Sequence, residues 1–334
     1  MLFGEMIKSD IKSIDNVYLH GNLLKTIENI TQNKIYNYIR YILDNLKYKI
    51  INHGTSNWSN KIHVLSFKDT INQLINTNCS IIRYGDGEFN LIEGKSIGFQ
   101  NENTEISNLL KKILNTESED LMIAIPDVFG SLSWLDIRSA RFWQRQREIN
   151  RETYLTNLSE SKVYGNAHVF RPYIVSSKKN REDVNEIYSS IKTLWNDKDI
   201  VIIEGSTTKM GVGNDLLYGC KTVERIICPS VNAFSKIEEI LTIATNIDKH
   251  KLILLSLGPT AKVLGYELYR LGYRVIDTGH IDSDYEWFCK KVNWKTRLDN
   301  GKHNAEGDDS QINIGFISKD EIDKYVSEII AEIT

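Results

Sequence analysis

The segment from Lys251 to Asp277 restricts the possible folds of this chain more than any other. An apolar run, Leu252 to Leu257, ends in Gly258-Pro259-Thr260. Leucines then recur at helical spacing until Gly272, and a second apolar run leads to Asp277. This pattern predicts a strand, a helix and a second strand parallel to the first, joined by a right-handed crossover. Parallel strands of this kind occur almost entirely in α/β proteins with helices on both faces of the sheet.

The same alternation continues through most of the chain. Further strands are expected at residues 79–83, 121–125, 162–164, 200–203 and 225–228, with helical patterns between them. We therefore predict an α/β fold with a doubly wound, mainly parallel sheet. Near the end of the chain, Ser318 and Glu321 have the spacing of a capping box, which predicts a final helix that runs on through Ile333.

Residues 1–60 differ in composition from the rest, being poor in glycine and rich in Asn, Ile, Lys and Tyr. We divide the chain into an N-terminal helical extension, 1–60, and a catalytic domain, 61–334. Apolar residues recur at helical spacing in the extension and predict an amphipathic helix: Ile35, Tyr38, Ile39, Ile42, Leu43 and Leu46. The simpler expectation is that this helix packs on its own domain. Its basic residues could instead suit an anionic surface or a partner enzyme.

Charge and hydropathy exclude several classes of protein. The formal net charge is −3, and nucleic-acid binders usually carry a clustered basic excess, so no nucleic-acid partner is expected. There is neither a signal-peptide pattern nor a run of about 18 apolar residues. We expect a soluble, cytoplasmic protein whose membrane contact, if any, is peripheral at the inner face. Four scattered cysteines without a C-x-x-C pair argue against zinc. No feature indicates an oligomeric state.

The first polar cluster that follows a predicted strand is Arg83-Tyr84-Gly85-Asp86-Gly87-Glu88-Phe89. Ligands of open α/β sheets lie beyond the carboxyl ends of the strands. In an extended segment, Asp86 and Glu88 would point the same way and could face one divalent cation. Such an ion could bridge diphosphate oxygens. Most D-x-E pairs in proteins are simply exposed to solvent. The interpretation as a metal site therefore depends on the position of this pair after a strand and on the two glycines.

A second acidic cluster, Thr278 to Trp287, follows the strand that ends at Asp277. It offers His280 and three carboxylates at alternating positions, namely Asp282, Asp284 and Glu286. These residues compete with the first cluster for the ion, or they supply a base that deprotonates an acceptor hydroxyl. The plainer interpretation is a helix N-terminus with favourable acids in its first turns.

Backbone anion sites are expected at two further places. Gly258 and Thr260 lead into a helix whose N-terminus suits a phosphate. The glycine-rich segment 204–215 carries Lys209 but lacks the P-loop order, and no G-x-G-x-x-G opens a helix, so ATPase and dehydrogenase functions lose support. Polar residues after other strands include Pro126-Asp127. We expect the donor substrate to contact Arg83, Gly85, Asn166, Arg171, Lys209, Asn214, Asn232, Gly258 and Thr260.

Taken in order, these clusters resemble the bacterial GT-D-type glycosyltransferases, a family first catalogued as a domain of unknown function. The elements that carry the resemblance are Arg83–Phe89, Ile125–Asp127, Tyr164–Ala167, Arg171–Tyr173, Gly211–Leu216, Asn232–Phe234, Leu257–Lys262, Gly279–Asp282 and Tyr285–Trp287. The resemblance covers residues 62 to 330. It implies a Rossmann-like fold, a UDP-sugar donor such as UDP-glucose, and a Mn²⁺ or Mg²⁺ ion at a D-x-E motif, here Asp86 and Glu88.

The leading hypothesis is therefore a metal-dependent transferase that moves a hexose, glucose in the best-known members, from a UDP-sugar to a glycan acceptor on bacterial surface glycoproteins or polysaccharides. His280, Asp282, Asp284 and Glu286 are the candidate catalytic residues. A sugar-phosphate hydrolase or nucleotidyltransferase that uses the same carboxylates is the alternative. A non-catalytic carbohydrate- or nucleotide-binding module is less favoured, because paired acids are costly to hold together without a cation.

Overall fold

The computed structural model describes residues 33–51, 61–181, 183–296, 298, 302 and 317–334. In this part of the chain nine strands form one sheet in the order β1-β4-β3-β2-β8-β7-β5-β6-β9, and every pairing is parallel. The strands are β1 His63–Val64, β2 Ser80–Arg83, β3 Leu121–Ile125, β4 Val163–Asn166, β5 Asp199–Gly205, β6 Thr222–Cys228, β7 Leu252–Ser256, β8 Val275–Asp277 and β9 Ile329–Glu332.

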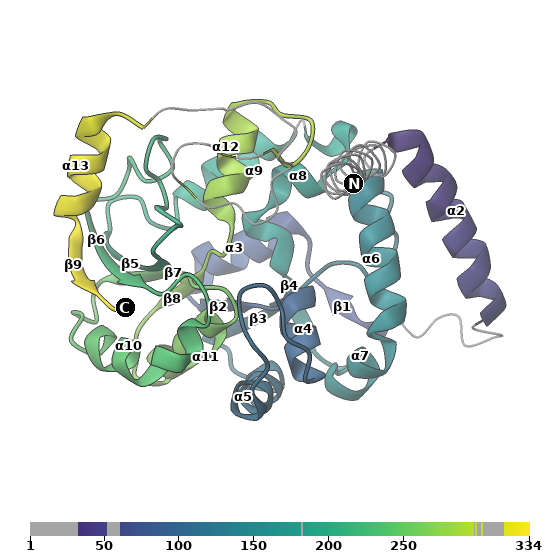
Figure 1. The fold of residues 1–334 in the computed structure, drawn as a ribbon, viewed down its shortest axis with the longest axis horizontal. Helices are drawn as coiled ribbons and strands as arrows, with labels where there is room; N and C mark the ends of the chain where they lie inside the picture. Colours follow the sequence, from purple (N-terminus) through teal and green to yellow (C-terminus); the bar gives the residue numbers. More distant parts are fainter. Residues whose placement is uncertain (1–32, 52–60, 182, 297, 299–301, 303–316) are drawn as a thin grey trace, which may run out of the picture.

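Helices cover both faces of this sheet, as Figure 1 shows. On one face α4 packs on α5, α5 on α11 and α11 on α10; on the other, α12 packs on α8, α8 on α9 and α9 on α3. The predicted doubly wound α/β fold is therefore confirmed. The helices are α2 Lys34–Ile51, α3 Phe67–Thr77, α4 Asp86–Ile92, α5 Thr104–Leu114, α6 Ile137–Ile149, α7 Arg151–Asn157, α8 Pro172–Val175, α9 Val184–Lys192, α10 Ile237–Ala244, α11 Thr260–Arg270, α12 Ile281–Cys289 and α13 Lys319–Ser327.

The strand–helix–strand unit predicted from the sequence is present as β7, α11 and β8. The two strands are parallel, with Leu254 opposite Ile276. Gly272 ends the helix with φ +87°, a left-handed conformation that glycine adopts without steric cost. The helix packs on both β8 and β2. This unit therefore brings the end of β8 beside the end of β2, where the polar clusters of the sequence lie.

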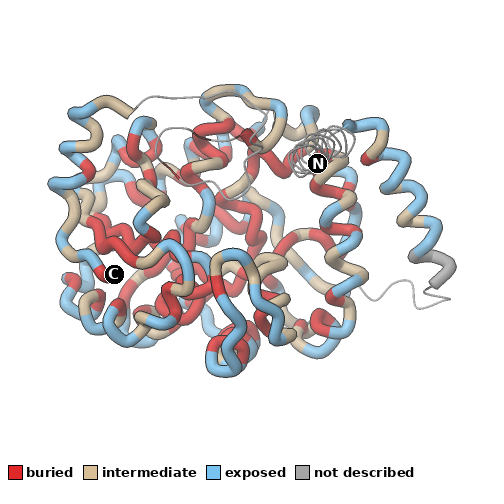
Figure 2. Tube along the Cα trace, viewed as in Figure 1, coloured by how far each residue is buried: buried red, intermediate tan, exposed pale blue. Residues whose placement is uncertain are grey.

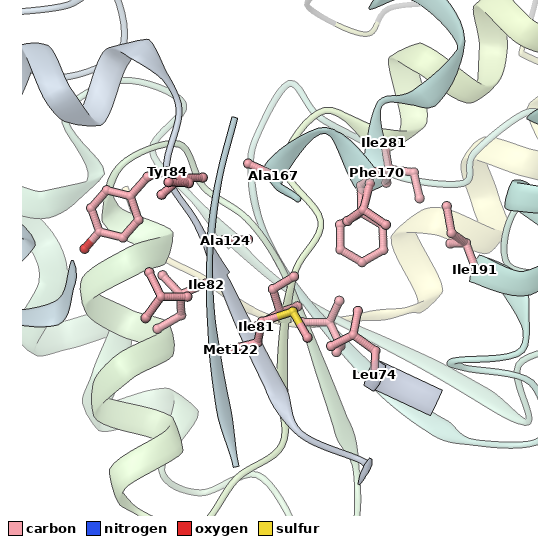
Figure 3. Close-up of a cluster of buried hydrophobic side chains, with 14 of the residues drawn as sticks. Leu74, Ile81, Ile82, Tyr84, Met122, Ala124, Ala167, Phe170, Ile191 and Ile281 are labelled. Atoms are coloured by element: carbon pink, nitrogen blue, oxygen red, sulfur yellow. The ribbon is translucent and has the colours of Figure 1, made fainter. Parts of the chain in front are cut away.

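The central strands are apolar throughout because they lie in the core of the protein. Strand β3 is buried at every position because both faces of the sheet are covered. Figure 3 shows Ile82 and Tyr84 on one side of the sheet, with Phe170 and Ile281 on the other. Tyr84 donates its hydroxyl to the carbonyl of Leu110 in α5 at 2.8 Å, so even this buried phenol has a partner.

The C-terminal prediction is half right. The capping box of Ser318 and Glu321 opens α13 as expected. The helix ends at Ser327, however, and residues Ile329–Glu332 form β9 on the outer edge of β6. Exposed and covered side chains alternate along this segment: Ile333 is 2% exposed and Ile330 is 52% exposed. That is the two-residue period of a strand with one covered face.

The N-terminal helix is confirmed as α2, but it packs in an unexpected orientation. It lies against α6 at the β1 end of the sheet. Asn37, on its polar side, is buried at 4% exposure, whereas the apolar side chains of the predicted stripe are exposed (Figure 2). The expected packing of this helix on its own domain is therefore confirmed, but the contact is made through the polar side of the helix rather than through its apolar face. None of the described helices has the length and apolar run needed to cross a bilayer.

Strand β9 and helix α13 are joined to the sheet by a buried ionic network. Arg225 of β6 binds Glu204 of β5 at 2.6 Å and Glu328 at 2.7 Å, and it donates to the carbonyl of Met210 at 2.9 Å. Glu204 accepts the backbone N–H of Met210 at 2.8 Å. The network therefore fixes the start of the glycine-rich segment as well as the C-terminus. Burial raises the pKa of Glu204 although Arg225 opposes the shift.

We predict that Arg225→Met lowers the free energy of unfolding by about 3–5 kcal/mol, because it leaves two carboxylates in the protein interior without their cation. Lys221→Met is the matched control, since Lys221 forms a 3.1 Å ion pair with Asp199 at the surface and should cost no more than about 1 kcal/mol. Urea unfolding of both variants measures the difference. Equal effects of the two substitutions would show that the buried network does not hold the C-terminal elements.

Candidate functional site

The ends of β2 and β8 are the topological switch point of the sheet. The two strands are neighbours, with Ile81 opposite Ile276. The helix after β2, α4, lies on one face, and the helix after β8, α12, lies on the other (Figure 1). Open α/β sheets bind ligands where the connections diverge in this way. We call residues 83–88 and 277–280, together with the start of α11, the β2–β8 junction.

Arg83 ties three strands together at this junction. Its Nε donates to the backbone carbonyl of Asp277 at 2.5 Å, and its Nη1 donates to the carbonyl of Ala167 at 2.7 Å. The backbone N–H of Arg83 donates to Asp277 Oδ2 at 3.1 Å. Gly279 has φ +51°, and a Cβ there would collide with the Arg83 guanidinium. Arg83, predicted to contact the donor, therefore has a structural task first.

A second cation, Lys262 of α11, completes the cluster. Its Nζ lies 3.1 Å from Asp277 Oδ2, 3.2 Å from Glu88 Oε1 and 3.1 Å from the carbonyl oxygen of Gly258. Lys262, Glu88 and Asp277 are all buried. Together with Arg83 they make two cations and two carboxylates, so their charges sum to zero. One carboxylate oxygen, Asp277 Oδ1, is buried without a hydrogen-bond partner and lies 3.5 Å from Arg83 Nη2.

The D-x-E segment does not have the extended geometry that we predicted. Helix α4 begins at Asp86, so Asp86 and Glu88 lie in its first turn, where residues two apart point in different directions. Glu88 turns back and accepts the N–H of Gly85 at 2.7 Å while it pairs with Lys262. Asp86 is partly exposed. The sequence signal for this helix start is a glycine N-cap with an acid three residues later.

The acidic residues of α12 are engaged inside the fold. Asp284 is fully buried and accepts hydrogen bonds from the N–H groups of Tyr173 and Ile174, at 2.8 and 3.0 Å, and from the hydroxyl of Tyr188 at 2.7 Å. Burial raises the pKa of its carboxyl, although Arg171 and these hydrogen bonds oppose the shift. This geometry does not support the predicted catalytic role for Asp284.

Asp282 and Glu286 anchor the glycine-rich segment. Asp282 accepts the N–H of Gly211 at 2.8 Å and the amide of Asn214 at 2.9 Å. Lys302 binds both acids, at 2.7 Å to Asp282 and 3.3 Å to Glu286. Burial would raise the pKa of Glu286, but Lys302 and hydrogen bonds from Lys290 and Asn214 outweigh it, so its pKa is lowered. A low pKa makes Glu286 a weak base. Asn214, predicted to bind the donor, is used in this network instead.

Two further donor-site predictions fall after β4. The Asn166 side chain is buried and accepts the N–H of His168 at 2.9 Å. Arg171 lies 5.8 Å from the Trp287 ring centre. Burial, with help from Arg171 and Arg83, lowers the pKa of His168 to about 3, so its imidazole is neutral. The structure gives Asn166 a structural role and places Arg171 beside α12 rather than at the β2–β8 junction.

Of the remaining predicted residues, His280, Gly258 and Thr260 lie at or beside the junction. His280 is exposed, and its ring lies 6.0 Å from that of Phe99. Asn232 holds the segment that carries Phe99: its N–H donates to the Phe99 carbonyl at 2.8 Å, and its Oδ1 accepts the N–H of Asn101 at 2.7 Å. Gly258 has φ +51° and lies beside Phe99, and Thr260 is the first residue of α11. Lys209 lies in the glycine-rich segment at φ +49°.

Asp127 is a residue that the sequence did not single out as catalytic. It follows β3, the strand next to β2, two positions beyond its carboxyl end. It makes no hydrogen bond or ion pair with the described residues, and burial raises the pKa of its carboxyl to about 6. A carboxylate with this pKa can accept a proton near neutral pH. The only sequence signal was its position after a strand, which Asp127 shares with many non-catalytic residues.

A metal at the junction would not be held by a cage of protein ligands. No group of three or more His, Cys, Asp or Glu residues that could hold an ion occurs in the part of the chain that the structure describes. Mg²⁺ and similar ions commonly keep several waters and bind through one or two carboxylates plus substrate phosphates. The partly exposed Asp86 fits that mode of binding. A small cavity lined by Met122, Lys162 and Gly165 lies near the amino ends of β3 and β4, away from the junction at the carboxyl ends of the strands.

Comparison with known proteins finds relatives that are named as glycosyltransferases. The chain is 39% identical to a probable glycosyl transferase Gly of Streptococcus gordonii over 274 residues, which is 82% of this chain and 39% of that protein. It is 38% identical to the glycosyltransferase GlyD of Streptococcus pneumoniae over 276 residues, 81% of this chain and 33% of that one. The chain thus spans little more than a third of the length of these relatives.

Solved structures agree with the sequence comparison. One, described as a highly conserved domain of unknown function with a distinct glycosyltransferase fold, superposes with a TM-score of 0.77 at 37% identity, over 83% of this chain and 97% of that one. Another, described as a new glycosyltransferase from Streptococcus sanguinis, has a TM-score of 0.75 at 39% identity, over 82% and 100% of the two chains. The family model described as the glycosyltransferase GT-D fold matches residues 81–307, and the chain belongs to this family.

Proposed function

We propose that the chain transfers a hexose, glucose in the first instance, from a UDP-sugar to a glycan acceptor during synthesis of bacterial surface glycoproteins or polysaccharides, with Mn²⁺ or Mg²⁺ as cofactor. The observation that carries the proposal is the charge balance of the β2–β8 junction. Arg83 and Lys262 are paired with Asp277 and Glu88, and Asp86 adds one negative charge. A nucleotide diphosphate placed there needs a further cation.

Asp86 would hold that cation, and Glu88 would position Asp86 through the first turn of α4. Bound Mn²⁺ or Mg²⁺ would neutralise the negative charge that develops on the departing diphosphate. The start of α11 directs its positive helix dipole toward the same region. The N–H groups of Ala261 and Lys262 already donate to carbonyls of the preceding turn, so the dipole is the main contribution of this helix. Lys262 keeps Glu88 and Asp277 in place, so it acts as a positioning residue rather than as a phosphate ligand.

Phe99 and His280 offer a partly exposed pair of rings beside Gly258. We assign them to the nucleobase or sugar of the donor, because planar groups pack well on aromatic faces. Asn232 holds the segment that carries Phe99 through two hydrogen bonds, to the Phe99 carbonyl and from the Asn101 N–H. In this assignment Asn232 acts on the donor indirectly, through Phe99.

Asp127 is the candidate base for an inverting reaction. Its carboxylate would accept the proton of the acceptor hydroxyl as that oxygen attacks the anomeric carbon and the bond to the diphosphate breaks. A retaining reaction would need no strong base at this position. The location of Asp127 beyond β3, next to β2, puts it on the carboxyl edge of the sheet with the rest of the junction.

We predict that a UDP-hexose raises the melting temperature of the full chain only when Mn²⁺ or Mg²⁺ is present, and that Asp86→Asn abolishes both this shift and transfer. Saturation at about a hundred times Kd should add about 2.7 kcal/mol to the stability of the wild-type protein. The matched variant Glu88→Gln should mainly lower stability, by about 1–3 kcal/mol, since it loses its pairing with Lys262. Full metal-dependent activity in Asp86→Asn would refute the metal assignment. Release of free sugar with no acceptor product would favour a hydrolase instead.

For Asp127 we predict a pH dependence. The base form predominates above its pKa, so kcat/KM should rise with pH through about 6 and level off above it. Asp127→Asn should lower kcat by roughly 10²–10⁴ and remove this limb of the profile. A variant with unchanged rate and an unchanged profile would show that Asp127 is not the base, without bearing on donor binding.

Asp284→Asn separates a structural role from a catalytic one. The substitution places an amide where the N–H of Tyr173 and the hydroxyl of Tyr188 now donate to a carboxylate. We therefore expect the stability to fall by about 1–3 kcal/mol, with kcat preserved below the melting temperature. Asp320→Asn, at an exposed position of α13, should change stability by less than about 0.5 kcal/mol. A large fall in kcat with unchanged melting temperature would return Asp284 to the list of catalytic candidates.

A further inference from the structure

Helix α2 is attached to the domain through its polar side. Arg141 of α6 donates to Asn37 Oδ1 at 3.0 Å and lies 3.8 Å from Asp44 Oδ2. The same guanidinium lies over the Tyr36 ring, 5.2 Å from its centre. Lys34 reaches Asp136 at 3.5 Å. Polar and ionic contacts thus hold the face of α2 that an ordinary surface helix would turn to solvent.

The opposite face of α2 is an exposed apolar stripe. Its six members are between 42% and 71% exposed: Ile35, Tyr38, Ile39, Ile42, Leu43 and Leu46. Their spacing of three, four and seven residues puts them on one side of the helix. Figure 2 shows exposed residues recurring along α2, with intermediate and buried residues between them. Large contiguous apolar patches on a protein surface mark interaction sites.

Basic residues flank the stripe on both sides. By helical periodicity Arg40 and Lys47 lie along one flank and Lys34 along the other. The helix contains four basic residues and one acid, a charge of +3, although the whole chain carries −3. The acid, Asp44, is 15% exposed and is turned toward Arg141. Arg40 and Lys34 lie 3.7 and 3.5 Å from Asp44 and Asp136, yet they remain 44% and 47% exposed beside the stripe. No described side chain of α2 is an exposed carboxylate.

This charge distribution selects among the possible partners. Pairing two copies of the stripe would place basic flanks against basic flanks, and like charges in contact are destabilising. An anionic lipid surface suits both features, because apolar side chains enter the boundary of the acyl chains while Lys and Arg stems extend to the phosphates. A helix of 18 residues is about 27 Å long, enough to lie along the surface.

We propose that the α2 stripe docks the protein on the surface of an anionic lipid bilayer, with α2 parallel to the membrane plane. Helix α2 is at the β1 end of the sheet, away from β2 and β8, so docking leaves the β2–β8 junction accessible (Figure 1). The proposal concerns a surface outside residues 81–307, the part that matches the family, and it does not depend on the sugar donor.

The test is sedimentation of the full chain with vesicles of phosphatidylcholine, with and without phosphatidylglycerol. Binding should require the anionic lipid and weaken with added salt. The double variant Ile39→Asp/Ile42→Asp should lower the apparent partition constant at least about tenfold, since it removes two apolar side chains from the lipid boundary. Lys47→Gln should lower it about fivefold through the loss of one charge. Val326→Asp, an exposed apolar position on α13, is the matched control and should bind like the wild type.

Three results would overturn the proposal. The full chain could fail to bind anionic vesicles, or the double variant could bind as well as the wild type. Light scattering could also show a dimer that the double variant converts to a monomer without any vesicle binding, which would make the stripe a contact between copies. The melting temperature, measured on every variant, reports folding separately from docking.

Discussion

The four paired charges at the β2–β8 junction are the constraint on which the rest of the structure depends. Arg83 joins β2, β8 and the segment after β4, while Lys262 joins α11 to α4 and β8. Removing one partner of a buried ion pair leaves the other charge uncompensated and is strongly destabilising. The positions of α4, α11 and β8 are therefore coupled at one point. That point is also where the topology of the sheet puts a ligand.

Much of the fold was predictable because its signals are local. The β7–α11–β8 unit follows from apolar runs and Gly272, and the start of α13 follows from Ser318 and Glu321. Errors arose where tertiary contacts decide. Residues 329–333 fit a helix and a strand alike until the free edge of β6 selects the strand. Helix α6 was missed because its sequence, rich in Arg and Gln, has little apolar periodicity.

The location of the site was predictable from the sequence, but the role of each residue in it was harder to predict. Strand ends gather polar side chains, and the sequence shows which ones follow a strand. It does not show that Asp284 meets Tyr173 from 111 positions away, or that Asp282 meets Gly211 from 71 positions away. Those contacts engage the α12 acids inside the fold, whereas Asp127 has no such partner among the described residues. When several acids lie near an active site, the better candidate for a base is therefore the one whose carboxylate has unmet hydrogen-bonding capacity, however many acids lie close together elsewhere.

Charge balance at the junction also bears on how substrate and ion would bind. Arg83 and Lys262 already neutralise Asp277 and Glu88. A diphosphate alone would therefore add charge that these residues do not balance, and a divalent cation alone would exceed the single negative charge of Asp86. Each would supply the charge that the other lacks, so their binding should be coupled, and by linkage the coupling must act equally in both directions. A protein arranged in this way holds the ion weakly until the donor arrives. Under the proposed function, one partly exposed carboxylate at the start of α4 would then be enough to hold the ion, without a preformed cluster of ligands.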